Sequence, residues 1–139
     1  MMPTLKNNTP DEVIIHAGIN DTMQLADKDG GMSSEVMDII ANNIIKCGQV
    51  AKSYGINIVC ISALLPIRGK KYQQTISHIN YRIEHMCKRE GFDYITNANI
   101  SFREATPVDE GLHYKDTLHL NVAGRQVLME NFISYLGMH

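Results

Sequence analysis

Residues 13–21, VIIHAGIND, decide the fold of this chain, because a short apolar run there leads into a polar turn. The run Val13–Ile15 stands between Pro10 and Gly18 and is apolar without alternation. That pattern is typical of a strand buried on both faces of a parallel sheet. The residues after the run are types that commonly end strands. We therefore predict a first, buried strand whose carboxyl end carries polar side chains.

The segments that follow alternate between helical and strand patterns. Apolar residues recur at helical spacing over two long stretches, which end at Gly55 and Gly91, glycines that favour a left-handed backbone. The predicted elements are a helix from Ser33 or Ser34 to Gly55, a strand over 56–62, a helix over 73–90, a strand over 92–96 and a last helix after Asn121. Because parallel strands need helical crossovers, this order predicts a three-layer α/β/α, flavodoxin-like fold with a parallel sheet.

The helical spacing also predicts which side chains face the core. It places Ile39 and Cys47 on the inner face of the first long helix and Leu136 on that of the last helix. The three cysteines, Cys47, Cys60 and Cys87, are widely spaced on apolar segments. This arrangement predicts buried free thiols, and neither a disulfide framework nor a metal site.

The composition is that of one ordinary globular domain over residues 1–139, with 44% hydrophobic and 20% charged residues. The formal net charge of −2 leaves no basic stripe, so we expect no nucleic-acid partner. No apolar stretch approaches the ~20 residues that cross a bilayer, and the N-terminus lacks a secretory signal. We therefore expect no membrane span and a cytoplasmic location.

Two polar clusters fall at the predicted carboxyl edge of the sheet, where such folds bind ligands. Asp116 and His119 stand three residues apart before the last helix. At this spacing a carboxylate can orient an imidazole and leave its second nitrogen free to act as a base. Asn20 carries an amide that can donate to an oxyanion. Loop solubility, helix capping and an Asx-turn explain the same residues without catalysis.

The serines supply no convincing nucleophile. Ser62 follows a predicted strand but lacks the glycine-flanked turn that exposes a nucleophilic hydroxyl, and Ser101 is no better candidate. His16, two residues before Gly18, is interpreted as a structural histidine whose ring is satisfied within the fold.

VIIHAGIND and the later segment DTLHLNVAG, residues 116–124, together resemble the SGNH (GDSL-type) hydrolase family. One block of that family is a strand ending in Gly-x-Asn-Asp, matched by Gly18, Asn20 and Asp21. Another block is Asp-x-x-His, matched by Asp116 and His119. The resemblance implies an SGNH hydrolase fold that cleaves small carboxylic esters.

The resemblance also implies a role for each matched residue. His119 would take the proton of a nucleophilic serine, Asp116 would orient His119, and Asn20 would donate to the oxyanion. Gly18 and Asp21 would support the turn. No metal or organic cofactor is implied.

The chain departs from the family pattern at its start. The Gly-Asp-Ser block, which holds the nucleophile, and the glycine block that adds an oxyanion donor have no match. Only residues 1–12 precede the first strand, too few for the two strands and the helix that hold those blocks. We therefore expect the C-terminal part of the fold, truncated at its N-terminus and nearly inactive alone.

Two other hypotheses stay open. A non-catalytic binding protein could reuse the fold and form an oligomer through an exposed sheet edge. A flavodoxin-like nucleotide-binding module would need a glycine-rich phosphate loop, which the sequence lacks.

Overall fold

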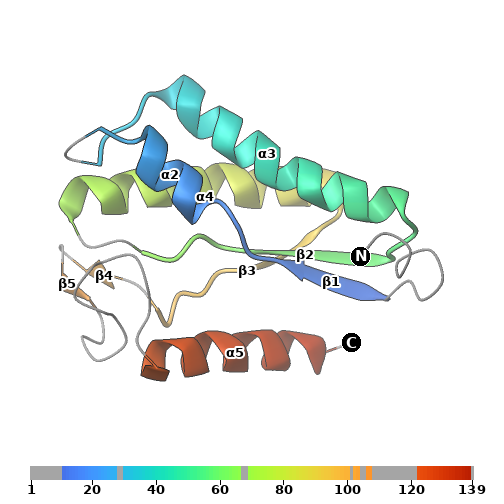
Figure 1. Cartoon of the computed structure of the whole chain (residues 1–139). Helices are drawn as coiled ribbons and strands as arrows, with labels where there is room; N and C mark the ends of the chain where they lie inside the picture. Colours follow the sequence, from blue (N-terminus) through green and yellow to red (C-terminus); the bar gives the residue numbers. More distant parts are fainter. Residues whose placement is uncertain are drawn as a thin grey trace.

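The computed structural model describes residues 11–27, 30–66, 69–100, 102–103, 106–107 and 122–138, which form an α/β structure (Figure 1). The elements, in chain order, are β1 Glu12–Ile15, α2 Ile19–Leu25, α3 Ser34–Ser53, β2 Ile58–Ser62, α4 Lys70–Glu90, β3 Asp93–Ile95, β4 Phe102–Arg103, β5 Thr106–Pro107 and α5 Val122–Leu136.

A parallel sheet of three strands, in the order β1-β2-β3, forms the centre of the structure. Glu12 is in register with Ile58, and Cys60 with Asp93. Helices α3 and α4 lie in the crossovers between neighbouring strands, as parallel pairing requires. The prediction of an α/β fold with a parallel sheet is confirmed.

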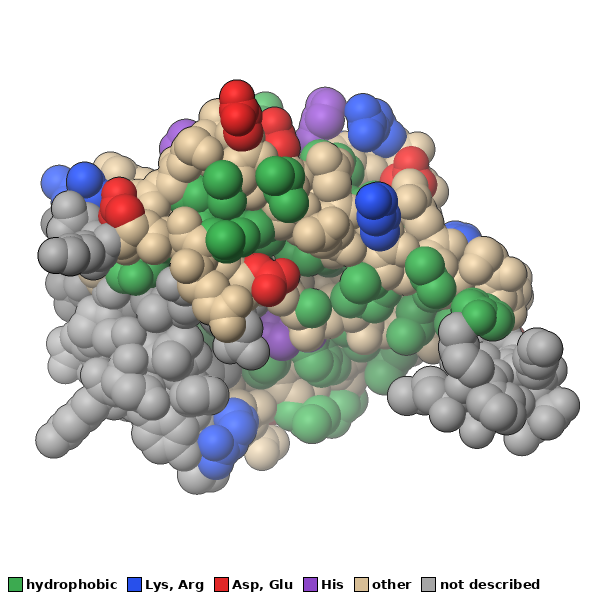
Figure 2. All heavy atoms as spheres, turned by 45° about the horizontal axis from the view of Figure 1, so that its top comes forward, with side chains coloured by type: hydrophobic (Ala, Val, Ile, Leu, Met, Phe, Trp, Pro, Cys, Tyr) green, Lys and Arg blue, Asp and Glu red, His purple; other side chains and the backbone are tan. Residues whose placement is uncertain are grey.

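The helices lie on both faces of this sheet (Figure 1). Helices α2, α3 and α4 lie on one side, and α5 runs across the other. The core between the sheet and the first helical layer is almost all aliphatic, and its most deeply buried side chains include Ile40, Ile61, Ile79 and Ile83. Figure 2, which turns this layer toward the viewer, shows acidic and basic side chains interspersed with apolar ones. Among the described residues, no helix is both long and apolar enough to cross a membrane.

The start of α3 and the end of α4 lie where the sequence predicts them, whereas α4 begins at Lys70, three residues earlier than predicted. Ser33 caps α3, and its hydroxyl oxygen accepts a hydrogen bond from the N–H of Val36 at 3.3 Å. Gly91 ends α4 with φ +74°, a left-handed conformation that glycine adopts without strain.

Three side chains that were predicted to face inward are exposed instead. Ile39 is 54% exposed, Leu136 is 45% exposed, and Cys47 is also exposed. In α3 the buried position next to Cys47 is Gly48, where a Cβ would stand 2.6 Å from the ring of Phe92. The helix therefore turns its glycine to the core, and the cysteine beside it faces solvent.

The sequence pattern missed two short features. Helix α2 begins directly after Gly18, where only a polar turn was predicted, because seven residues are too few to show helical periodicity. Strands β4 and β5 form an antiparallel pair between the predicted strand over 92–96 and the predicted last helix, where no element was predicted. Both features lie at the carboxyl side of the parallel sheet (Figure 1).

Candidate functional site

The polar turn after β1 leads the chain into α2. Gly18 has φ +104°, and its carbonyl accepts hydrogen bonds from the N–H of the buried Thr22 at 3.0 Å and from its hydroxyl at 2.8 Å. Asp21 is exposed in the first turn of α2, where a carboxylate is favoured by the helix dipole. The turn is thus fixed by main-chain conformation and by one buried threonine.

Three predicted site residues fall outside the structural description. These are Asp116, His119 and the side chain of Asn20, whose backbone lies in the first turn of α2. Their roles as orienting carboxylate, base and oxyanion donor stay predictions. The described part of this sheet edge is dominated by a hydrogen-bond network that the sequence analysis did not predict.

His16, Ser62 and Asn97 stand at the carboxyl ends of β1, β2 and β3, and one hydroxyl joins them. His16 Nδ1 lies 2.9 Å from Ser62 Oγ, and Asn97 Nδ2 donates to the same oxygen at 2.9 Å. Asn97 Nδ2 also donates to the carbonyl of Ala63 at 3.1 Å. The three strand ends are therefore held together by side chains as well as by the sheet.

The donors in this network follow from the chemistry of the groups. Because the Asn97 amide donates to Ser62 Oγ, the proton of the serine is available for His16 Nδ1. His16 is exposed as a residue, but desolvation of its ring lowers its pKa, which favours the neutral ring that accepts this proton. Phe132 of α5 meets the imidazole edge-on, with ring centroids 6.0 Å apart. These contacts support the interpretation of His16 as a structural histidine.

Ser62 is placed to hold strands together and not to meet a substrate. Its side chain is buried, with 2% exposure, and its oxygen contacts two neighbouring side chains. A nucleophilic serine needs an exposed hydroxyl beside a base. An imidazole lies beside Ser62, but the serine hydroxyl is buried.

The network continues onto α5 through three asparagines. Asn97 is buried and adopts φ +53°, and its Oδ1 accepts from Asn131 Nδ2 at 3.2 Å. Asn131 and Asn99 exchange two amide hydrogen bonds, of 2.9 and 3.0 Å. Helix α5 is thereby tied to the sheet edge from which the site would be built.

The two buried cysteines, Cys60 and Cys87, do not supply a nucleophile, and no cysteine belongs to a metal site in the described part of the chain. Cys60 and Cys87 are free and buried, as predicted, and burial raises the pKa of both thiols to about 12. At neutral pH such thiols stay protonated and unreactive. Within the described ranges, no group of three or more His, Cys, Asp or Glu side chains is arranged to hold a metal ion.

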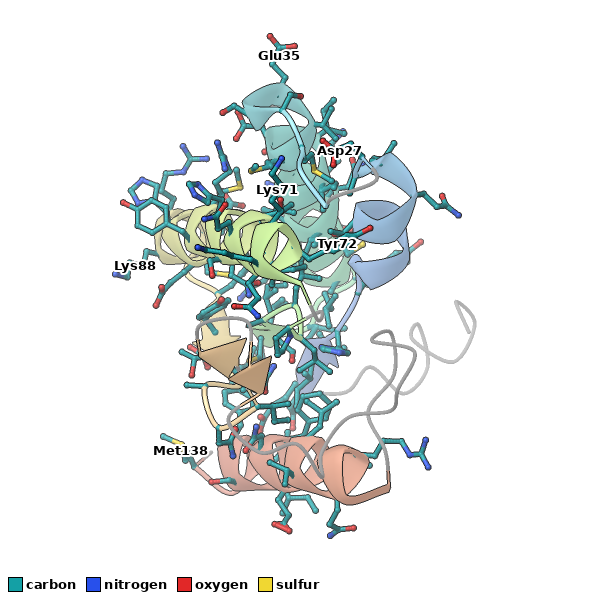
Figure 3. All side chains as sticks on the ribbon, turned by 90° about the vertical axis from the view of Figure 1, so that its left-hand side faces the viewer. Asp27, Glu35, Lys71, Tyr72, Lys88 and Met138 are labelled. Carbon is teal, nitrogen blue, oxygen red and sulfur yellow. The ribbon has the colours of Figure 1, made fainter. Side chains whose placement is uncertain are left out.

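A cavity of about 570 Å³, here called the β3–α5 cavity, opens beside the asparagine network. Residues 93–99 line it on the sheet side, and Asn131, Ser134, Tyr135 and Met138 line it on the helix side. The Tyr135 hydroxyl donates to Asp93 Oδ2 at 2.7 Å. Figure 3 shows Met138 at the end of α5. The volume is within the usual range for ligand sites. No sequence motif marks the cavity, which arises from the packing of two elements.

Comparison with known proteins identifies the fold. No family model and no curated protein matches the chain. Among solved structures, the chain is similar to a GDSL-like lipase from Bacteroides thetaiotaomicron, with a TM-score of 0.74 and 19% identity, over 99% of this chain and 69% of that one. It is also similar to a candidate acylhydrolase from Bacteroides fragilis, with a TM-score of 0.72 and 17% identity, over 99% of this chain and 68% of that one. The chain has the fold of these GDSL-like hydrolases.

Proposed function

We propose that this chain forms the larger part of an SGNH-type hydrolase domain that cleaves carboxylic esters. The observation that carries the proposal is the coincidence of motif and fold. The Gly-x-Asn-Asp turn of residues 18–21 follows β1 at the carboxyl edge of a sheet whose structural neighbours include a GDSL-like lipase. Ligands bind at this edge in open α/β sheets. A small ester is the substrate class that these features support.

In the proposed reaction a serine hydroxyl attacks the ester carbonyl and His119 accepts its proton. Asp116 orients His119, and Asn20 donates a hydrogen bond to the oxyanion of the tetrahedral intermediate. When the intermediate collapses, the ester C–O bond breaks and His119 returns the proton to the departing alcohol. Water then hydrolyses the acyl-serine by the same sequence of proton transfers.

We place the nucleophile of this reaction outside the printed sequence. Ser62, the serine at the carboxyl end of the central strand, is buried. A Gly-Asp-Ser segment supplied from outside these residues would complete the triad. Removing a triad serine costs about 10⁶-fold in turnover in a well-studied hydrolase, so the 139 residues alone should be nearly inactive.

The test compares this chain with a version extended by its native upstream coding sequence. Both are assayed on short-chain aryl esters and treated with a fluorophosphonate probe. We expect labelling and turnover only in the extended form, both lost in its His119→Ala variant and kept in its His85→Ala variant, which changes an exposed histidine of α4. An extended form that contains no Gly-Asp-Ser and is not labelled would refute the proposal.

One observation favours a second candidate, a non-catalytic binding protein. Among the described residues β1 pairs only with β2, and its apolar side chains are half-buried where those of β2 are mostly buried. An open apolar edge invites pairing with another chain, so this candidate predicts a stable oligomer. A cooperatively folded chain that light scattering finds monomeric would exclude pairing through this edge.

A further inference from the structure

The β3–α5 cavity runs along the outer edge of β3. Successive side chains of a strand point to opposite faces, yet all three residues of β3, Asp93, Tyr94 and Ile95, line this cavity. Tyr94 points toward the α4 side, where its hydroxyl donates to the carbonyl of Asn80 at 3.5 Å, whereas Asp93 points toward α5. A cavity that both faces line must therefore lie along the strand edge.

The ladder between β2 and β3 shows which peptide groups meet this cavity. A parallel ladder uses the peptide groups of alternate residues, and the Ala63 N–H donates to the Ile95 carbonyl at 2.9 Å. The N–H and C=O of Tyr94, one residue earlier, consequently point away from β2. Within the described residues these two groups have no hydrogen-bond partner, as is typical of the outer side of an edge strand.

The walls of the cavity are already fixed by internal hydrogen bonds. Tyr135 holds Asp93 at 2.7 Å, and Asn99 and Asn131 hold each other through two amide bonds. A site whose side chains are held before binding loses less entropy when a ligand arrives. Among the described residues, the lining contains one carboxylate, Asp93, and no Lys, Arg or His, so the charge of this part of the lining disfavours an anionic ligand.

We propose that the β3–α5 cavity binds an extended peptide segment, uncharged or basic, that adds to β3 as a further strand. The Tyr94 peptide group supplies the paired main-chain donor and acceptor that strand addition requires, and the cavity gives room for alternate side chains. A single extended segment can enter between β3 and α5. The site is separate from the open edge of β1, because β1 and β3 lie at opposite edges of the three-stranded sheet.

The experiment titrates the ¹⁵N-labelled chain with a library of acetylated, amidated pentapeptides free of Asp and Glu. Binding should shift the amide resonance of Tyr94 and slow its hydrogen exchange. N-methylation of the bound peptide at successive positions should abolish binding at alternate residues, because alternate peptide groups face the strand. The proposal would be overturned if no peptide of the library bound, or if N-methylation weakened binding equally at every position. Binding of oligosaccharides, tested in place of the peptides, would also overturn it.

Two matched variants locate the site. Ser134→Arg places a long side chain in the cavity from an exposed position of α5 and should weaken peptide binding by about tenfold or more. Ser53→Arg, at the exposed end of α3, makes the same chemical change elsewhere and should leave binding unchanged. Equal effects of the two variants would place the peptide elsewhere. Because no step uses ester hydrolysis, these results stand apart from those that test the proposed function.

Discussion

The side chain of Asn97 makes three hydrogen bonds at the carboxyl ends of the parallel strands. Its amide donates to Ser62 and Ala63 and accepts from Asn131, so it joins two strand ends to α5. It also adopts φ +53°, which asparagine and glycine tolerate better than other residues. The amide and the backbone conformation make separable contributions to stability.

Replacing Asn97 separates these contributions. Asn97→Ala should lower the free energy of unfolding by about 2–4 kcal/mol, since buried partners lose their hydrogen bonds and alanine is strained at positive φ. Asn97→Gly removes the same amide without the strain and should recover about 1 kcal/mol of that loss. Asn99→Ala, at an exposed position, should cost less than about 1 kcal/mol. Urea denaturation measures all three, and equal losses in the alanine and glycine variants would contradict the strain argument.

His16 gives the network a pH dependence. Burial lowers its pKa in the folded state below the ordinary 6.5, so the unfolded chain binds a proton more readily. Its contribution to stability is therefore complete above pH 6.5 and is lost as pH falls through the lowered folded-state pKa. The free energy of unfolding of the native chain should fall relative to that of His16→Gln as the solution is acidified.

The measurement is urea unfolding of both proteins at a series of pH values on either side of 6.5. Subtracting the two curves removes the titration of the other groups that the native chain and the variant share. His85→Gln, at an exposed position of α4, controls for the loss of a histidine as such. A constant difference between the native chain and His16→Gln across the series would contradict the assignment.

Helix α3 shows how packing decides what periodicity leaves open. The apolar spacing predicts its existence correctly, and Ser33, its cap, is one of the two predicted start residues, but the spacing places Cys47 inward. A neighbouring residue is only about 100° away around a helix, so a short apolar pattern fits two rotations almost equally well. Phe92 decides between them, since its ring fits against the face that presents Gly48. That contact joins residues far apart in sequence, and no local pattern reveals it.

Gly48→Ala tests this packing. Alanine gains about 1 kcal/mol of helix propensity, but its Cβ would stand 2.6 Å from the buried ring of Phe92, and overpacking of this kind costs about 1–3 kcal/mol. We expect a net loss of stability. Cys47→Ala, next to it on the exposed side, should change stability by less than about 0.5 kcal/mol. Adding Phe92→Leu to Gly48→Ala should reduce the loss, and purely additive effects in thermal unfolding would argue against direct contact.

At the scale of the whole molecule, the order of the parallel strands and the long helices was predictable, and the hydrogen-bond network at the site was not. Long apolar strands and helices impose their periods on the sequence, and parallel pairing then leaves few arrangements. The contact between His16 and Ser62, in contrast, depends on how two strands align within the sheet. The β3–α5 cavity depends in the same way on the seating of α5. Side-chain geometry of this kind follows from the assembled layers and leaves no trace in local spacing.

Hydrogen exchange of β1 reports whether the sheet edge is closed in the assembled molecule. The Ile58 N–H donates to the Asp11 carbonyl at 3.0 Å, and the parallel ladder then directs the N–H groups of Val13 and Ile15 toward β2 and that of Ile14 outward. In the dilute chain the Ile14 amide should exchange much faster than the amides on either side of it. Protection of Ile14 that grows with protein concentration would show edge pairing between copies, as the binding-protein candidate requires. Protection of the Ile14 amide only in the upstream-extended chain would show that the added segment pairs with β1, as the hydrolase proposal requires. Equal protection of all three amides in the dilute chain would contradict an open edge.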